Sequence, residues 1–341
     1  MADVAVTPVV TSGDTTARLR VAAFLHVGIF VALLSLLTFT AAPYGTAEPW
    51  WKAAFVCAVF LICIVAISET LIGGEWRIEG SSGLLLSMLA LSTLALLQTI
   101  SIRSGSPDAA VAALKPWNAI SADPYQTRFF ALQLLSLTTL LALFYRYCST
   151  PSRISVLIHL ILAIAMASAL FGILRQTVQH EPGFVLPRLK PGQGFGQFIN
   201  KNHFALLMEM AFGLGIGMGL LSGPNRERMM VYVALLLPIW TGLVLSNSRG
   251  GVLAMLAQVM VASLLLMSSA GRDGNSVRGR AWIVRGAVVA ILVAVISIGA
   301  VWVGGDRLVS SFSDVRREFT ENDPRVGVTR SEIWRATWKM F

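Results

Sequence analysis

Charged residues are scarce in this sequence. They make up 13% of the 341 residues, whereas hydrophobic residues make up 55%. Soluble domains carry about 25% charged residues, and the mean hydropathy of +0.69 is correspondingly high. This composition excludes an ordinary soluble domain. Because a helix crosses the hydrocarbon core with roughly 20 apolar residues, the chain has room for many membrane spans.

Cysteine and histidine are also rare, with three and four residues respectively. Cys57 and Cys63 lie inside one apolar segment and Cys148 ends another, so they are interpreted as small apolar residues rather than as a disulfide framework or metal ligands. The sequence contains no nucleotide-binding or zinc motif, and we expect no cofactor and no metal. His26 and His159, inside apolar segments, are interpreted as structural.

Acidic residues are outnumbered, 18 against 27 basic ones, which gives a formal net charge of +9. The basic residues lie in the loops between apolar segments. This placement favours anionic lipid, or an anionic substrate held in the membrane, over nucleic acid as a partner.

The apolar runs predict an all-α integral membrane protein, a polytopic helical bundle with about nine transmembrane helices. The first run is too long for a signal-peptide core and lacks a clear cleavage site, so it is expected to be a retained helix. The runs cover approximately residues 21–42, 50–68, 83–101, 129–147, 154–175, 203–222, 229–246, 250–270 and 283–303.

Lysine and arginine in the loops predict the orientation, because short cytoplasmic loops are enriched in them. If every run crosses, three basic loops and the N-terminal tail fall on one side, which we assign to the cytoplasm of a bacterial inner (plasma) membrane. The residues concerned are Arg18, Arg20, Arg146, Arg153, Arg226, Arg228, Arg272, Arg278, Arg280 and Arg285.

This topology divides the chain into five regions. Residues 1–20 form a cytoplasmic tail, 21–176 five spans, and 177–202 an outer, glycine-rich basic loop. Residues 203–303 form four further spans, and 304–341 form an outer segment.

Basic residues also lie on the outer side, where the topology does not require them. The stretch from Arg175 to Lys201 carries four of them, including Arg188 and Lys190, against the single acidic residue Glu181. Such a stretch is either statistical variation in loop charge or an anion-binding segment.

Within that stretch, segment 187–204 is the first candidate site. Asn200 or Asn202 can cap a helix that starts near His203, with Lys201 beside the free N–H groups, a combination that suits phosphate. A flexible loop with an ordinary helix cap is the alternative. Three glycines resist helix formation and permit close backbone approach to a ligand: Gly192, Gly194 and Gly196.

The second candidate site is segment 245–252, which joins two predicted spans with almost no loop. Arg249 is therefore expected at the outer membrane boundary, where it either extends toward water or binds an anion. Ser248 supplies a hydrogen-bond donor beside it. Glu209, about two turns into its own span, needs a partner or a polar cavity.

The C-terminal segment 329–341 has the spacing of an amphipathic helix, which lies either at the membrane interface or against the outer face of the bundle. The recurring residues are Ile333, Trp334, Thr337, Trp338 and Phe341.

The two candidate sites together resemble the O-antigen ligase and polymerase superfamily. The resemblance rests on Phe-Ile-Asn-Lys-Asn-His-Phe-Ala at 198–205 and Leu-Ser-Asn-Ser-Arg-Gly-Gly at 245–251, separated by two predicted spans. Arg330-Ser-Glu-Ile-Trp-Arg looks like the start of that family's large periplasmic region. The specific resemblance covers roughly residues 195–341.

The resemblance implies a membrane-embedded glycosyltransferase of the C class. Such enzymes move a glycan from an undecaprenyl-diphosphate carrier to an acceptor at the periplasmic face, without a nucleotide sugar. The acceptor is lipid A-core, a growing polysaccharide chain or a protein hydroxyl. The implied diphosphate ligands are Lys201 and Arg249, with Arg188, Lys190, Asn202, Ser248 and Arg330 as further candidates.

The same resemblance implies that a histidine acting as general base lies beyond Phe341, which leaves His203 as a weak candidate. The sequence ends within the amphipathic segment, so we expect the chain to be incomplete as a catalyst. Two other functions stay open: a transporter or flippase of an anionic lipid-linked substrate, and an inactive relative that serves as a scaffold in envelope assembly.

Overall fold

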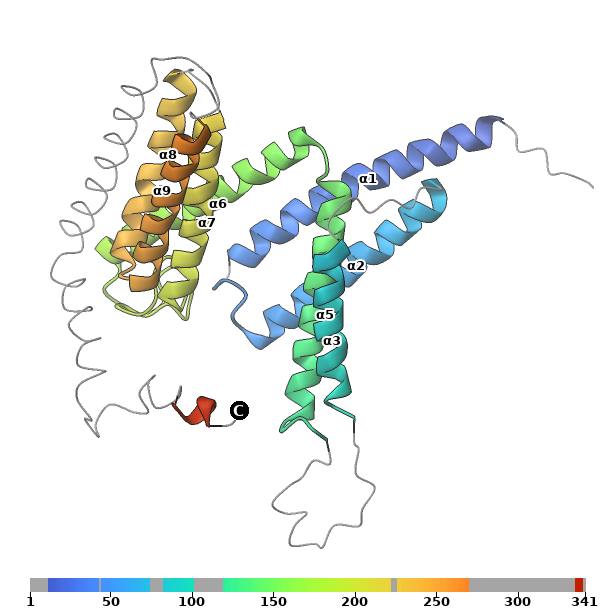
Figure 1. The fold of residues 1–341 in the computed structure, drawn as a ribbon, viewed down its shortest axis with the longest axis horizontal. Coiled ribbons are helices and arrows are strands. Elements are labelled where there is room, and N and C mark those ends of the chain that lie inside the picture. Colours follow the sequence, from blue (N-terminus) through green and yellow to red (C-terminus); the bar gives the residue numbers. More distant parts are fainter. Residues whose placement is uncertain are drawn as a thin grey trace, which may run out of the picture. The chain divides into compact units, whose positions relative to one another are not determined.

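The computed structural model describes residues 12–42, 44–73, 82–100, 119–221, 226–269 and 335–339. Within these ranges the chain is helical and forms no β-strand. Eight of the nine predicted runs coincide with a helix, and the ninth, 283–303, lies outside the described residues (Figure 1). The helices are α1 (Ser12–Ala41), α2 (Pro49–Gly73), α3 (Ser82–Leu97), α5 (Pro124–Tyr147), α6 (Pro151–Val178), α7 (Lys201–Leu221), α8 (Arg226–Leu245) and α9 (Arg249–Ser269).

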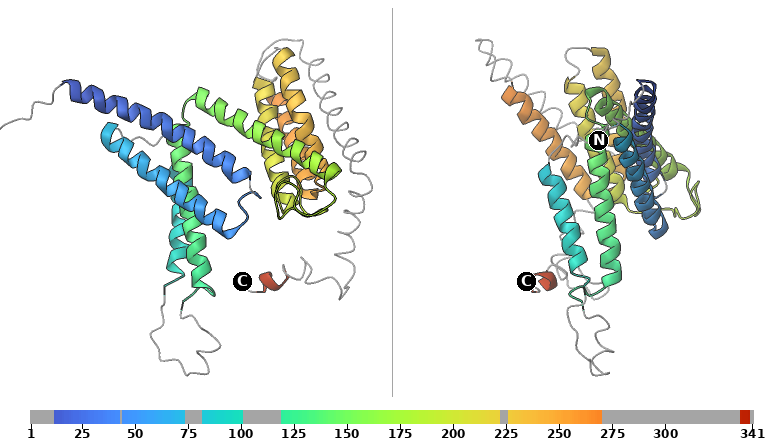
Figure 2. Two further views of the ribbon diagram at one scale, coloured as in Figure 1. Left: turned by 180° about the vertical axis from the view of Figure 1, so that it is seen from behind. Right: turned by 90° about the vertical axis from the view of Figure 1, so that its right-hand side faces the viewer.

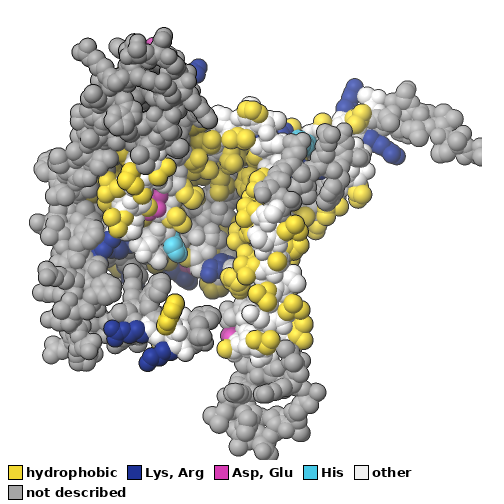
Figure 3. All heavy atoms as spheres, viewed as in Figure 1, with side chains coloured by type: hydrophobic (Ala, Val, Ile, Leu, Met, Phe, Trp, Pro, Cys, Tyr) yellow, Lys and Arg dark blue, Asp and Glu magenta, His cyan; other side chains and the backbone are white. Residues whose placement is uncertain are grey.

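Four of these helices are long and apolar enough to cross a membrane, which indicates a membrane protein. They correspond to α1, α2, α5 and α6. Large apolar side chains such as Phe24, Leu61 and Leu71 are exposed, and hydrophobic side chains cover much of the visible surface of the described helices (Figure 3). Exposure on this scale is unfavourable in water and favourable in lipid.

Residues 1–157 form one compact unit. In this unit α1 packs on α2, α3 packs on α5, and α2 also packs on α5, as both views of Figure 2 show for the first two pairs. Asp123 fixes the start of α5, because its side chain accepts a hydrogen bond from the Gln126 N–H and Pro124 occupies the first turn. The buried apolar core joins α1, α2 and α5 through Ile29, Leu33, Ala66, Leu143 and Tyr147.

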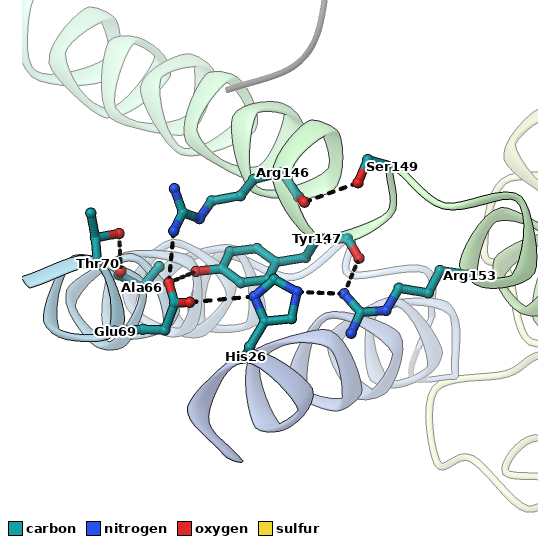
Figure 4. A network of polar contacts seen from close by, with 8 residues as sticks. All are labelled: His26, Ala66, Glu69, Thr70, Arg146, Tyr147, Ser149 and Arg153. Carbon is teal, nitrogen blue, oxygen red and sulfur yellow. Dashed lines mark hydrogen bonds and ion pairs between the residues drawn. The ribbon is translucent and has the colours of Figure 1, made fainter. Parts of the chain in front are cut away.

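A buried polar cluster crosses this core, with Glu69 at its centre (Figure 4). The Glu69 carboxylate accepts hydrogen bonds from Arg146 Nη2 at 2.8 Å and from the Tyr147 hydroxyl at 3.0 Å. His26 Nδ1 lies 3.4 Å from the same carboxylate, and Arg153 Nη1 lies 2.8 Å from His26 Nε2. Because arginine can only donate, His26 Nε2 accepts and Nδ1–H points to Glu69. The network accounts for His26 as a structural residue.

Residues 158–341 form the second unit. Here α7 packs against both α8 and α9, and the core also includes residues of α6. Gly251 permits the close approach of α9 to α7, since a Cβ atom at this position would lie 2.9 Å from the Cβ of Ala205. His159 on α6 lies 3.1 Å from the Tyr232 hydroxyl on α8, so it too has a structural contact.

Candidate site at the paired helix N-termini

The N-termini of α7 and α9 lie side by side and are joined by a hydrogen bond from the capping residue of α9 to the first turn of α7. The Asn200 side chain accepts a hydrogen bond from the Asn202 N–H at 2.9 Å and caps α7. The Ser248 hydroxyl accepts from the Gly251 N–H at 3.4 Å and donates to Asn202 Oδ1 at 3.0 Å. One hydroxyl therefore caps α9 and holds it against α7. The partial positive charges at the N-terminal ends of two helix dipoles therefore lie close together.

Lys201 and Arg249 are the first residues of these two helices. Lys201 Nζ donates to the carbonyl of Asn247 at 3.0 Å, and Asn247 adopts a left-handed conformation with φ of 55°. Arg249 is half-buried and has no acceptor or carboxylate partner among the described residues. Two full positive charges thus accompany the two helix dipoles.

The glycine-rich loop before α7 folds into a tight turn. The backbones of Phe195 and Phe198 exchange two hydrogen bonds, at 3.1 and 3.0 Å. Both rings pack against Phe204 of α7, with centroid separations of 4.7 and 6.1 Å. Gly194 and Gly196, with φ of 66° and 56°, supply the left-handed backbone that this turn requires. The loop is therefore an ordered structure that is fixed to α7.

Arg175, in the last turn of α6, holds the same loop from the other side. Its guanidinium is buried, with 5% of the residue exposed, and donates four hydrogen bonds. Three go to the carbonyls of Lys190, Gln193 and Gly196, at 2.6, 2.8 and 2.8 Å, and one goes to Gln179 Oε1 at 2.6 Å. No described carboxylate neutralises its charge.

The loop, α6 and the start of α7 enclose a cavity of about 300 Å³. Its charged lining residues are Arg175 and Lys201, and none of its lining residues is acidic. Gln176, Gln193 and Asn247 add polar groups to the wall. A cavity with two cationic side chains and amide donors is suited to bind an anion, with Lys201 as the charged hydrogen-bond donor and Arg175 as a nearby positive charge.

The other predicted site residues within the described ranges do not line this cavity. Arg188 and Lys190 have exposed side chains on the loop, and Lys190 contributes its carbonyl to Arg175. His203 is exposed in the first turn of α7. Arg330 lies outside the described residues. In the described part of the chain, no three side chains of the metal-binding types are grouped closely enough to hold a metal ion.

The two candidate segments predicted from the sequence, around Lys201 and Arg249, are thus neighbours in the structure. The role of Arg175 in holding the loop was not predicted, because in the sequence it was interpreted only as one of the basic residues on the outer side. The available signal was its position one turn before the end of an apolar helix, where burial forces a guanidinium to find several acceptors.

Two neighbouring glycines of the loop allow a matched test of its geometry. At Gly194 an added Cβ would collide with the carbonyl oxygens of Phe198 and Ile199, whereas at Gly192, with φ of 71°, it would meet nothing within 4 Å. We expect Gly192→Ala to cost only the left-handed backbone term, about 1 kcal/mol, and Gly194→Ala to cost at least about 3 kcal/mol. Thermal unfolding of the two variants measures the difference; equal costs would contradict the turn described above.

Comparison with known proteins assigns no family. No protein-family model matches the chain, and no curated protein or solved structure is significantly similar to it.

Proposed function

We propose that the chain is a membrane glycosyltransferase of the O-antigen ligase or polymerase type and that its described residues bind the donor. It takes a glycan from undecaprenyl diphosphate and transfers it to an acceptor hydroxyl at the outer face of the membrane. The observation that carries the proposal is the pairing of the α7 and α9 N-termini, with Lys201 and Arg249, beside a cavity without an acidic lining residue.

A lipid diphosphate is both the carrier and the leaving group of this reaction. As the bond between the sugar and the diphosphate breaks, negative charge grows on the diphosphate oxygens, and donors fixed in advance lower the barrier. Lys201 is such a donor, and the positive ends of the two helix dipoles add to its effect. Arg175 adds a positive charge that already has four hydrogen-bond acceptors, so it acts on the site through its field and through the loop it holds.

The proposal assigns the described residues to the donor and its diphosphate. Activation of the acceptor hydroxyl is attributed, by resemblance to that family, to a histidine. The apolar surface of the helices suits a donor whose isoprenoid tail stays in the bilayer.

Binding of the carrier lipid tests the proposal directly. The full chain, reconstituted in lipid nanodiscs, is titrated with undecaprenyl diphosphate and, separately, with undecaprenol. Two oxyanions held by charge-assisted bonds are expected to give at least about a hundredfold tighter binding of the diphosphate. Equal affinities would overturn the proposal. A separate experiment supplies a glycan-linked undecaprenyl diphosphate to proteoliposomes. Movement of this lipid across the bilayer with its glycan still attached would favour the transporter instead.

A further inference from the structure

A second cavity lies in the unit formed by residues 1–157, as a groove on α5. Both α2 and α3 pack on α5 but not closely on one another, and the space between them, about 320 Å³, is lined chiefly by apolar side chains. Leu86 and Leu89 of α3 form one wall and are exposed, Cys63 and Ile67 of α2 form the other, and Leu135 of α5 forms part of the floor.

Arg146 lines one end of this groove. From Leu135 to Arg146 the groove follows about three turns of α5, or roughly 16 Å at 1.5 Å per residue. That length is about half of the 30 Å hydrocarbon core. The groove therefore has the length of one leaflet, with the arginine at its polar end and leucines at its deep end.

The position of Arg146 is fixed by the Glu69 network. Its Nη2 donates to the Glu69 carboxylate at 2.8 Å, so the guanidinium is oriented before any ligand arrives (Figure 4). A guanidinium carries five N–H groups on more than one edge and can bind two oxyanions at once. The described network contains the cationic Arg146 and Arg153 but a single carboxylate, so its overall charge is positive and complementary to an anion.

We propose that this groove binds an anionic phospholipid, with its phosphate at Arg146 and one acyl chain between α2 and α3. An apolar groove one leaflet deep, with a cation at its mouth, matches the two halves of such a lipid. A zwitterionic phospholipid fits the same groove but brings its own cation toward Arg146, which lowers its affinity. This inference concerns a different part of the chain from the proposed donor site and does not depend on it.

Native mass spectrometry of the full chain in detergent tests the proposal, by titration with phosphatidylglycerol and phosphatidylcholine of identical acyl chains. We expect about a fivefold preference for phosphatidylglycerol, the value for one cation near an anionic head group. The double variant Glu69→Gln/Arg146→Gln removes the ion pair without leaving a buried charge and is expected to abolish the preference. Arg128→Gln, at the other end of α5 and outside the groove, is the matched control and keeps it.

A groove-filling variant tests the acyl-chain part separately. Ala142→Trp places a large side chain in the lining of the groove and leaves every charge in place. It is therefore expected to lower the affinity for both lipids at least fivefold. Equal affinity of the wild-type chain for the two lipids would overturn the proposal. So would a preference that survives in the folded double variant, or lipid binding that Ala142→Trp leaves unchanged.

Discussion

Replacing Lys201 with methionine is expected to weaken the binding of undecaprenyl diphosphate about 10- to 100-fold. Methionine keeps an unbranched side chain one atom shorter than that of lysine and removes its charge. The loss corresponds to one charge-assisted hydrogen bond, about 1.5–3 kcal/mol. Lys201 lines the cavity, and its only described acceptor is a neutral carbonyl, that of Asn247, so its charge is available to an anion. Titration of the variant in nanodiscs measures the change.

Lys190→Met is the matched control for this experiment. Lys190 belongs to the same basic loop and loses the same charge, but its exposed side chain does not line the cavity. We expect a change of less than about threefold, the effect of a screened surface charge. Similar losses in the two lysine variants would mean that the loop attracts the lipid by its net charge alone, and the assignment of Lys201 as a specific ligand would then be wrong.

The sequence predicted the positions of the helices well, because an apolar run long enough to cross a membrane leaves the backbone little choice but helix. It predicted their ends less well. Hydropathy marks where lipid begins, whereas a helix continues as long as its backbone hydrogen bonds do. Thus α1 begins at Ser12, nine residues before the predicted run, and α2 extends to Gly73, five residues beyond it.

The candidate site could be predicted only where one short segment contains the relevant groups. The cap, the lysine and the glycines of segment 187–204 are neighbours in sequence, and the expectation that they form a helix start was confirmed. The bond between Ser248 and Asn202 joins residues 46 apart. Only the resemblance to a family suggested that the two segments belong together, and neither periodicity nor spacing contains that information.

The polar groups buried in the first unit were harder still to predict. In the sequence, three charged residues lie near the ends of apolar runs: Glu69, Arg146 and Arg153. The two arginines were used only to predict the orientation of the chain in the membrane. In the structure Arg146 bonds the Glu69 carboxylate directly, and Arg153 joins the same network through His26. This arrangement depends on how the helices cross, which packing decides. The lipid groove follows from the same crossing, since it is the space that α2 and α3 leave on α5.

Arg175→Met is expected to destabilise the second unit by at least about 3 kcal/mol and to release the glycine-rich loop. The variant removes four hydrogen bonds, to the Gln179 side chain, to the buried Gly196 carbonyl and to the part-buried carbonyls of Lys190 and Gln193. An unsatisfied buried acceptor costs about 1–3 kcal/mol. Thermal unfolding measures the stability. Limited trypsin digestion measures the opening of the loop, because cleavage after the exposed Arg188 requires the segment to open locally.

Two further variants separate the hydrogen bonds of Arg175 from its charge. Arg175→Lys keeps the charge, but an ammonium has three donors on one atom and cannot reach four acceptors spread around a planar guanidinium. It is therefore expected to resemble Arg175→Met in loop cleavage. Arg128→Met removes an arginine that has a single described hydrogen bond, at 3.4 Å. In this variant the glycine-rich loop is expected to be cleaved at the wild-type rate. Full rescue by lysine would mean that Arg175 serves the cavity by charge alone. The shape of the site would then be set by the Phe195–Phe198 turn and its packing on Phe204.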